Sequence, residues 1–162
     1  MPNGIFRNLS EAEYAVLMDA IPQIAILIGG ADGQIDLQEK EWAEKIAHIR
    51  SYSYEPELKP LYQDVDKTFK KKYEEIIKKL PTDLTARNKE LSQALSVLNN
   101  VFMKLNMKHA ALLYNGYLSY AEHIAKASGG FLRMFAVNES ENDWVGLPML
   151  DPIFFDDFEE EE

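Results

Sequence analysis

The sequence contains no cysteine, and this absence excludes several classes of protein at once. Disulfide-stapled folds, zinc–thiolate sites, iron–sulfur clusters and thiol nucleophiles all require cysteine side chains. The serines lack the context of a nucleophile elbow, and no glycine-rich segment carries the lysine of a phosphate loop. No histidine pair has the spacing of an HExxH zinc motif; the histidines are His48, His109 and His123. We therefore expect a protein that is not an enzyme.

Long hydrophobic runs are also missing. The most apolar stretch, residues 15–28, is interrupted by Asp19, Pro22 and Gln23, so we expect neither a signal peptide nor a membrane span. Bases are few: 17 Lys and Arg stand against 27 Asp and Glu, which gives a net charge of −10. Nucleic-acid binding needs a basic surface for the phosphates. We expect a cytoplasmic protein with no nucleic-acid partner and no membrane insertion.

The composition that remains is typical of a soluble globular domain. The chain has 162 residues, of which 46% are hydrophobic and 27% charged, enough for one domain with its own core. The acids are unevenly distributed, because the last twelve residues hold seven of them and no base. Without those seven charges the rest of the chain carries only −3. We divide the chain into a domain at residues 1–150 and an acidic, Phe-rich tail at 151–162.

Helical periodicity dominates the sequence. The clearest case has apolar residues at intervals of three or four, namely Leu61, Val65, Phe69, Tyr73, Ile76 and Leu80. Ser10 and Glu13 form a capping box that begins the first helix, and Pro22 is expected to kink or break it. The patterns predict helices at 10–28, 36–49, 58–80, 84–105 and 108–127, and a short final helix after Asn138 that is broken near Pro148.

No stretch alternates convincingly with period two, so the predicted fold is all-α. We expect five to seven helices in a single compact, bundle-like domain. Tyr114, Tyr117 and Tyr120 step by three along one predicted helix, and aromatic side chains at this spacing are typical of a core. The lysine-rich region 67–79 is interpreted as a solvated helix face with salt bridges between residues four apart, such as Lys70 with Glu74.

The segment at residues 25–39, in which an apolar run leads into Gly-Gly-Ala-Asp-Gly-Gln-Ile-Asp-Leu-Gln-Glu, resembles the signature of the TerB-like family, which is named for tellurite-resistance proteins. A second block, at 127–144, is similar to the second half of the same family pattern. Residues 35–42 and 137–144 also echo each other, since both consist of a β-branched residue, Asp or Asn, two variable residues, Glu, one variable residue, an acid and Trp. The resemblance implies an all-helical domain with two pseudo-related halves and a role in stress, metal or phage defence without an established reaction.

The resemblance further implies a weak Ca²⁺ or Mg²⁺ site where the turns before two helices approach each other. Asp32, Asp36 and Glu39 match the acidic positions of the first block, and Glu141 matches the acid of the second. Asn138 departs from the pattern because it stands where a second aspartate is expected. The second block also lacks an Asp-Gly pair. These departures weaken the case for metal in this chain.

The same acids have simpler interpretations. Asp32 and Asp36 occupy positions one and five of an EF-hand loop, but Leu37 replaces its glycine and Ala43 its final acid, so an EF-hand is not expected. Asp36 and Glu39 also suit a helix cap, which needs no metal. The sequence leaves both alternatives open: a divalent ion, or capping alone with no cofactor.

The tail combines aromatic and acidic residues. Phe154, Phe155 and Phe158 lie among seven acids, and exposed aromatic rings favour burial by roughly 1.5–3 kcal/mol each. They are candidate partner-binding residues that dock on their own domain or on another chain. Two functions follow: a helical binding or scaffold protein of TerB-like type, or a metal-free interaction module that acts through its tail. A protein partner is expected in both, and homo-oligomerisation stays open.

Overall fold

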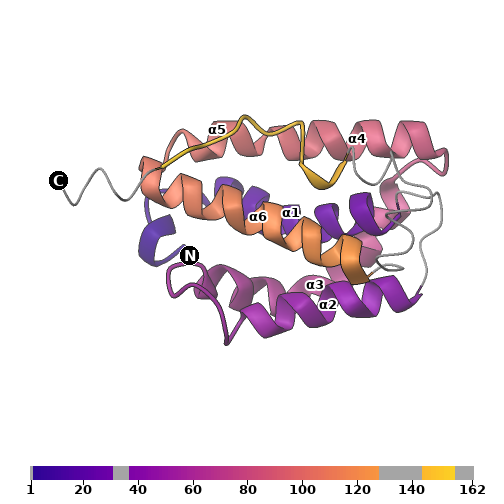
Figure 1. Cartoon of the computed structure of the whole chain (residues 1–162), viewed down its shortest axis with the longest axis horizontal. Helices are drawn as coiled ribbons and strands as arrows, with labels where there is room; N and C mark the ends of the chain where they lie inside the picture. Colours follow the sequence, from indigo (N-terminus) through magenta and orange to yellow (C-terminus); the bar gives the residue numbers. More distant parts are fainter. Residues whose placement is uncertain (1, 31–36, 128–143, 156–162) are drawn as a thin grey trace.

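A computed structural model describes residues 2–30, 37–127 and 144–155 (Figure 1). Within these ranges the chain forms six α-helices and one short 3₁₀ helix, Gly4–Phe6, and no strand. The helices pack around one cluster of buried apolar side chains. The predicted all-α bundle of five to seven helices is therefore confirmed. The predicted metal-site acids Asp32, Asp36 and Glu141, and the start of the predicted final helix, lie outside the described residues.

Helix α1, Glu11–Gly29, is the centre of the bundle. It contacts each of the helices α2 to α6, and in Figure 1 it passes behind α6. The predicted capping box is confirmed, because Ser10 Oγ accepts from Glu13 N while Glu13 Oε1 accepts from Ser10 N. By length and composition α1 could cross a membrane, but 61% of its most apolar window is buried within the bundle. Burial of that kind is typical of a core helix.

Pro22 was predicted to kink or break the first helix; α1 continues through it, so it does not break the helix. Proline removes one backbone donor from a helix interior and crowds the preceding turn, which costs about 3 kcal/mol. Pro22 is buried, as are Ile21 and Ile24 beside it. Because α1 is enclosed by other helices, burial of its apolar side chains offsets this local cost and keeps the segment helical.

Helices α2, Leu37–Arg50, and α3, Lys59–Lys79, pack against each other and against α1. The apolar stripe predicted for α3 is confirmed, because Leu61, Val65, Phe69 and Tyr73 are all buried. The helix has proline in its first turn and ends at Lys79, and the extended Leu80 separates it from Pro81.

The ion pairs of this region differ from those predicted. Glu74 pairs with Lys40 of α2 at 2.7 Å, and Asp19 of α1 pairs with Lys72 at 3.6 Å. The Lys40 ammonium is the main reason that the pKa of Glu74 is lowered, and Lys70 contributes less. Glu74 and Lys72 of α3 therefore pair with residues of α2 and α1 rather than with residues four positions away in α3.

The predicted helix at 84–105 is divided in two. Helix α4 spans Leu84–Ser96 and begins with Asp83, whose carboxylate accepts from Ala86 N. Val97 separates it from the short helix α5, Leu98–Phe102. Helix α6, Met107–Ala127, follows, and Asn106 caps it by accepting from His109 N. The tyrosines predicted to lie in the core do so: Tyr114, Tyr117 and Tyr120 are buried.

Residues 144–155 run beside α4 and α5 towards the end of the bundle where α6 begins (Figure 1, yellow). The Asn99 amide of α5 holds this segment at two points, because it donates to Met149 O and accepts from Asp151 N. Leu147 and Leu150 are buried in the core. Leu147 adopts a φ of 46°, a costly conformation for leucine, while its side chain is fully buried. The segment before the tail therefore belongs to the domain.

Candidate functional site

Of the four predicted metal ligands, only Glu39 lies within the described residues. Its side chain is buried in α2, and its Oε2 atom lies 3.5 Å from the point that a Cβ on Gly29 would occupy. The carboxylate thus packs closely against the end of α1. Among the described residues no group of three or more His, Asp or Glu side chains is placed to hold a metal ion. The predicted approach of the two acidic turns stays a prediction.

Arg50, at the end of α2, forms the most extensive polar cluster of the described residues, which we call the Arg50 cluster. The guanidinium is buried, and each of its partners is a neutral atom. None of the ion pairs in the described ranges includes it. Its acceptors lie 2.8–3.2 Å away and are the hydroxyls of Tyr54, Tyr62 and Ser119, the carbonyl of Gly116, and Nδ1 of His123.

Aromatic rings and a neutral histidine complete the Arg50 cluster. The guanidinium carbon lies 4.3 Å from the ring centre of Tyr54 and 5.5 Å from that of Tyr120. Because a guanidinium only donates, His123 must accept through an unprotonated Nδ1. Partial burial and then the Arg50 charge lower the pKa of His123, which agrees with that neutral form. This cluster joins α2 to α6, and both terminal nitrogens of the guanidinium have acceptors within the chain.

An apolar groove lies at the start of α6, and we call it the Met–Phe groove. It has a volume of about 320 Å³ and is lined by residues of α5, α6, their connection and the C-terminal segment: Asn99, Phe102, Met103, Leu105, Met107, Ala110, Asp151 and Ile153. Met103 is 84% exposed and Met107 62% exposed. Phe154, which follows Ile153, is also 84% exposed. No other large apolar side chain in the described ranges is as exposed as Met103 and Phe154.

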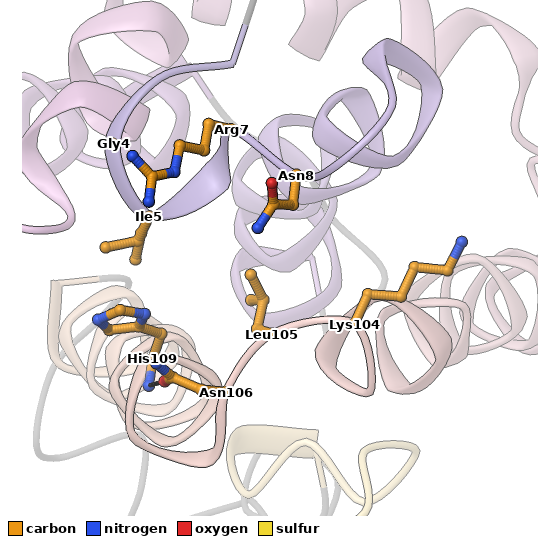
Figure 2. A pocket seen from close by; sticks show the side chains of 8 residues that line it. All are labelled: Gly4, Ile5, Arg7, Asn8, Lys104, Leu105, Asn106 and His109. Carbon is orange, nitrogen blue, oxygen red and sulfur yellow. Dashed lines mark hydrogen bonds between the residues drawn. The ribbon is translucent and has the colours of Figure 1, made fainter.

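A basic pocket adjoins the groove, and the two share Leu105. Its volume is about 450 Å³, and its lining includes no acid among Gly4, Ile5, Arg7, Asn8, Lys104, Leu105, Asn106 and His109. Figure 2 shows Arg7 and His109 on one side of the pocket with Ile5 between them, whereas Lys104 projects to the other side. This lining is therefore positively charged, although the chain as a whole carries a net charge of −10.

The two cations of the basic pocket are differently engaged. Lys104 forms an ion pair with Glu13 of α1, and this contact lowers the pKa of Glu13 to about 2. Arg7 is exposed, and no ion pair in the part of the chain that the structure describes includes it. Its guanidinium is therefore the charge at this pocket that is free to meet a carboxylate or phosphate from outside.

Together the Met–Phe groove and the basic pocket form one surface at the end of the bundle. An apolar side chain fits the groove, whose volume falls in the range of roughly 300–1,000 Å³ typical of ligand pockets. An acidic group fits the adjoining Arg7. The lining of this surface thus combines an apolar hollow with a neighbouring cation.

The predicted partner-binding residues have different positions. Phe154 is exposed and does not dock on its own domain, whereas Phe155 is partly buried. Phe158 lies outside the described residues. The sequence reasoning missed Met103, Met107 and Arg7. Met103 and Met107 lie on either side of the α5–α6 connection, so they do not belong to the apolar stripe of a single helix and helical periodicity could not place them together.

Comparisons with models of protein families, with curated proteins and with solved structures gave no match for this chain. The TerB-like resemblance therefore stays a prediction from two sequence blocks.

Proposed function

We propose that the protein is a non-catalytic, helical interaction module that binds a protein partner through the Met–Phe groove. One observation carries the proposal. Met103, which is 84% exposed, and Met107, which is 62% exposed, line the same groove, and the exposed Phe154 directly follows Ile153 of its lining. Scattered exposed apolar residues are ordinary, but several around one hollow are typical of an interaction site.

The chemistry of the lining suits protein recognition. Methionine is unbranched and polarizable, so Met103 and Met107 can adapt to the shape of an incoming side chain. Phe102 and Ile153 supply a firmer apolar floor, since both pack in or against the core. Asn99, which holds the C-terminal segment, keeps one wall of the groove in place. Burial of exposed methionine and phenylalanine would supply about 25 cal/mol for each Å² of apolar surface removed from water.

A photo-crosslinking amino acid at position 103 tests this proposal. The full chain carrying p-benzoylphenylalanine there is irradiated in its own cells, and adducts are identified by mass spectrometry of the joined peptides. The expected result is a specific adduct with one identified protein. The matched control places the crosslinker at Tyr52, which is 61% exposed in the α2–α3 connection and lies outside the groove lining. Equal labelling from both positions, or no adduct from position 103, would contradict the proposal.

A divalent ion at the turns before α2 and near Glu141 stays a separate prediction from the TerB-like resemblance. Ligands of the native state stabilise it by RT ln(1 + [L]/Kd). Melting temperature is therefore followed during titration with Ca²⁺, Mg²⁺ and Zn²⁺. A rise that disappears in the double variant Asp32→Ala and Asp36→Ala would support the ion, and no shift at millimolar metal would exclude it. The predicted stress or defence setting would be tested by the neighbouring genes.

A further inference from the structure

We propose that the Met–Phe groove receives Phe154 of a second copy of this chain, so that the protein self-associates through a two-fold symmetric interface. This inference rests on the proposed function and names its partner. Phe154 directly follows Ile153, a residue of the groove lining, and its own ring is exposed.

The donor side chain and its acceptor lie on one surface of each copy. Ile153 lines the groove and Phe154 follows it directly. Phe154 is 84% exposed, so it does not fill the groove of its own chain. A two-fold interface uses the same patch on both subunits, and a patch that carries both the inserting residue and the receiving hollow is self-complementary. Each copy can then give one phenylalanine and accept one.

Charge supports a second copy over an unrelated apolar partner. Two chains of net charge −10 repel unless opposite charges meet at the contact. The sequence contains six acids in the seven residues that follow Phe155. The basic pocket adjoins the groove, has no acid in its lining and presents Arg7 without an ion-pair partner in the described ranges. The chain that follows an inserted Phe154 carries these acids, and their negative charge is complementary to the basic pocket beside the groove.

Sedimentation velocity of the full chain tests the inference between about 1 µM and 500 µM, a span that detects micromolar association. The wild-type chain is expected to dimerise with rising concentration. Phe154→Ser is expected to raise the dimer Kd by at least about tenfold, as truncation of a central aromatic anchor does. Tyr52→Ser, which also removes an exposed ring, is the control and should dimerise like the wild type. Circular dichroism confirms that both variants keep the helical fold.

A wild-type chain that stays monomeric, or a Phe154→Ser variant that dimerises as tightly as the wild type, would overturn the inference. The crosslinker at position 103 separates this failure from failure of the proposed function. A crosslink between position 103 and the peptide around Phe154 of another copy supports both proposals. A crosslink to one different, identified protein overturns the second copy and leaves the interaction module standing. No crosslink overturns both.

Discussion

Helix α6 borders the Arg50 cluster at its middle and the Met–Phe groove at its start, and these regions differ in how their side chains are satisfied. At the Arg50 cluster a buried cation meets neutral oxygens, a neutral histidine and aromatic rings, all within its own chain. At the groove, Met103, Met107 and Phe154 leave most of their apolar surface in water. The polar groups of the Arg50 cluster find their partners within the monomer. The apolar side chains at the groove would be removed from water only by contact with another molecule.

The difference separates a structural role from a binding role. Taking a charge out of water is costly unless polar partners replace the water, and Arg50 has these partners. An exposed methionine or phenylalanine contributes little to folding, because its surroundings hardly change when the chain unfolds. Substitutions should therefore affect stability strongly at the first region and weakly at the second, whereas association should respond in the opposite order.

Arg50→Ala is expected to have the largest effect and to lower the free energy of unfolding by about 3–5 kcal/mol. The substitution leaves a cavity at the end of α2 and removes the donor to the buried Tyr62 hydroxyl. Urea denaturation measures the change. Lys67→Ala is the control, because the Lys67 side chain is 74% exposed and should matter little. A loss below about 1 kcal/mol for Arg50→Ala would mean that the cluster does not hold α2 and α6 together.

Raising the pH should also weaken this region. Burial raises the pKa of Tyr62 to about 12, although Arg50 opposes the shift, and burial raises the pKa of Tyr117 and Tyr120 as well. The folded state therefore holds these protons more tightly than the unfolded state, whose tyrosines titrate near 10. Stability is fully present below about pH 10 and is lost above it, by up to about 3 kcal/mol for Tyr62 alone.

Urea denaturation at about pH 9, 10 and 11 checks this loss. Tyr62→Phe has no proton to lose at this position, so its stability should fall less steeply over the same interval. Identical slopes for the variant and the wild type would show that Tyr62 does not carry the effect.

Gly116→Ala should have a smaller effect on the Arg50 cluster. A Cβ at this position would lie 3.3 Å from both Leu58 Cδ1 and the Tyr54 hydroxyl oxygen, so these neighbours must move. Alanine favours the helix by about 1 kcal/mol, and crowding costs about 1–3 kcal/mol, so we expect a net loss of about 1 kcal/mol in thermal or urea unfolding. Gly146→Ala is the control, because nothing lies within 4 Å of the position that a Cβ on Gly146 would occupy. A stabilised Gly116→Ala variant would show that the neighbours yield freely.

The sequence predicted the features that depend on neighbouring residues. The capping box of Ser10 and Glu13 formed because both partners lie within one helical turn. The stripe of α3 and the buried tyrosines of α6 followed from helical period alone. The break at Val97 was not predicted. The sequence left the course of the chain at Pro22 open between a kink and a break, and the packing of α1 against the other helices keeps it helical there.

The two regions beside α6 could not be predicted, because their residues come from distant parts of the chain. Arg50 is 66 positions from Gly116 and 73 from His123, and no local pattern signals their contact. The groove combines residues near positions 99–110 with others near 151–153. Long-range contacts of this kind appear only once the helices are packed.

The double variant Met103→Ser and Phe154→Ser should change the free energy of unfolding least, by no more than about 0.5 kcal/mol. Both side chains are 84% exposed, so folding removes little of their surface from water. The same variant should bind less of an apolar fluorescent dye such as bis-ANS, because it removes the apolar rim of the groove. Arg50→Ala, assayed in parallel under conditions where it stays folded, should lose stability but keep the dye signal. If the serine variant instead unfolded easily, the rim would belong to the core, and the contrast between a completed cluster and an open binding surface would disappear.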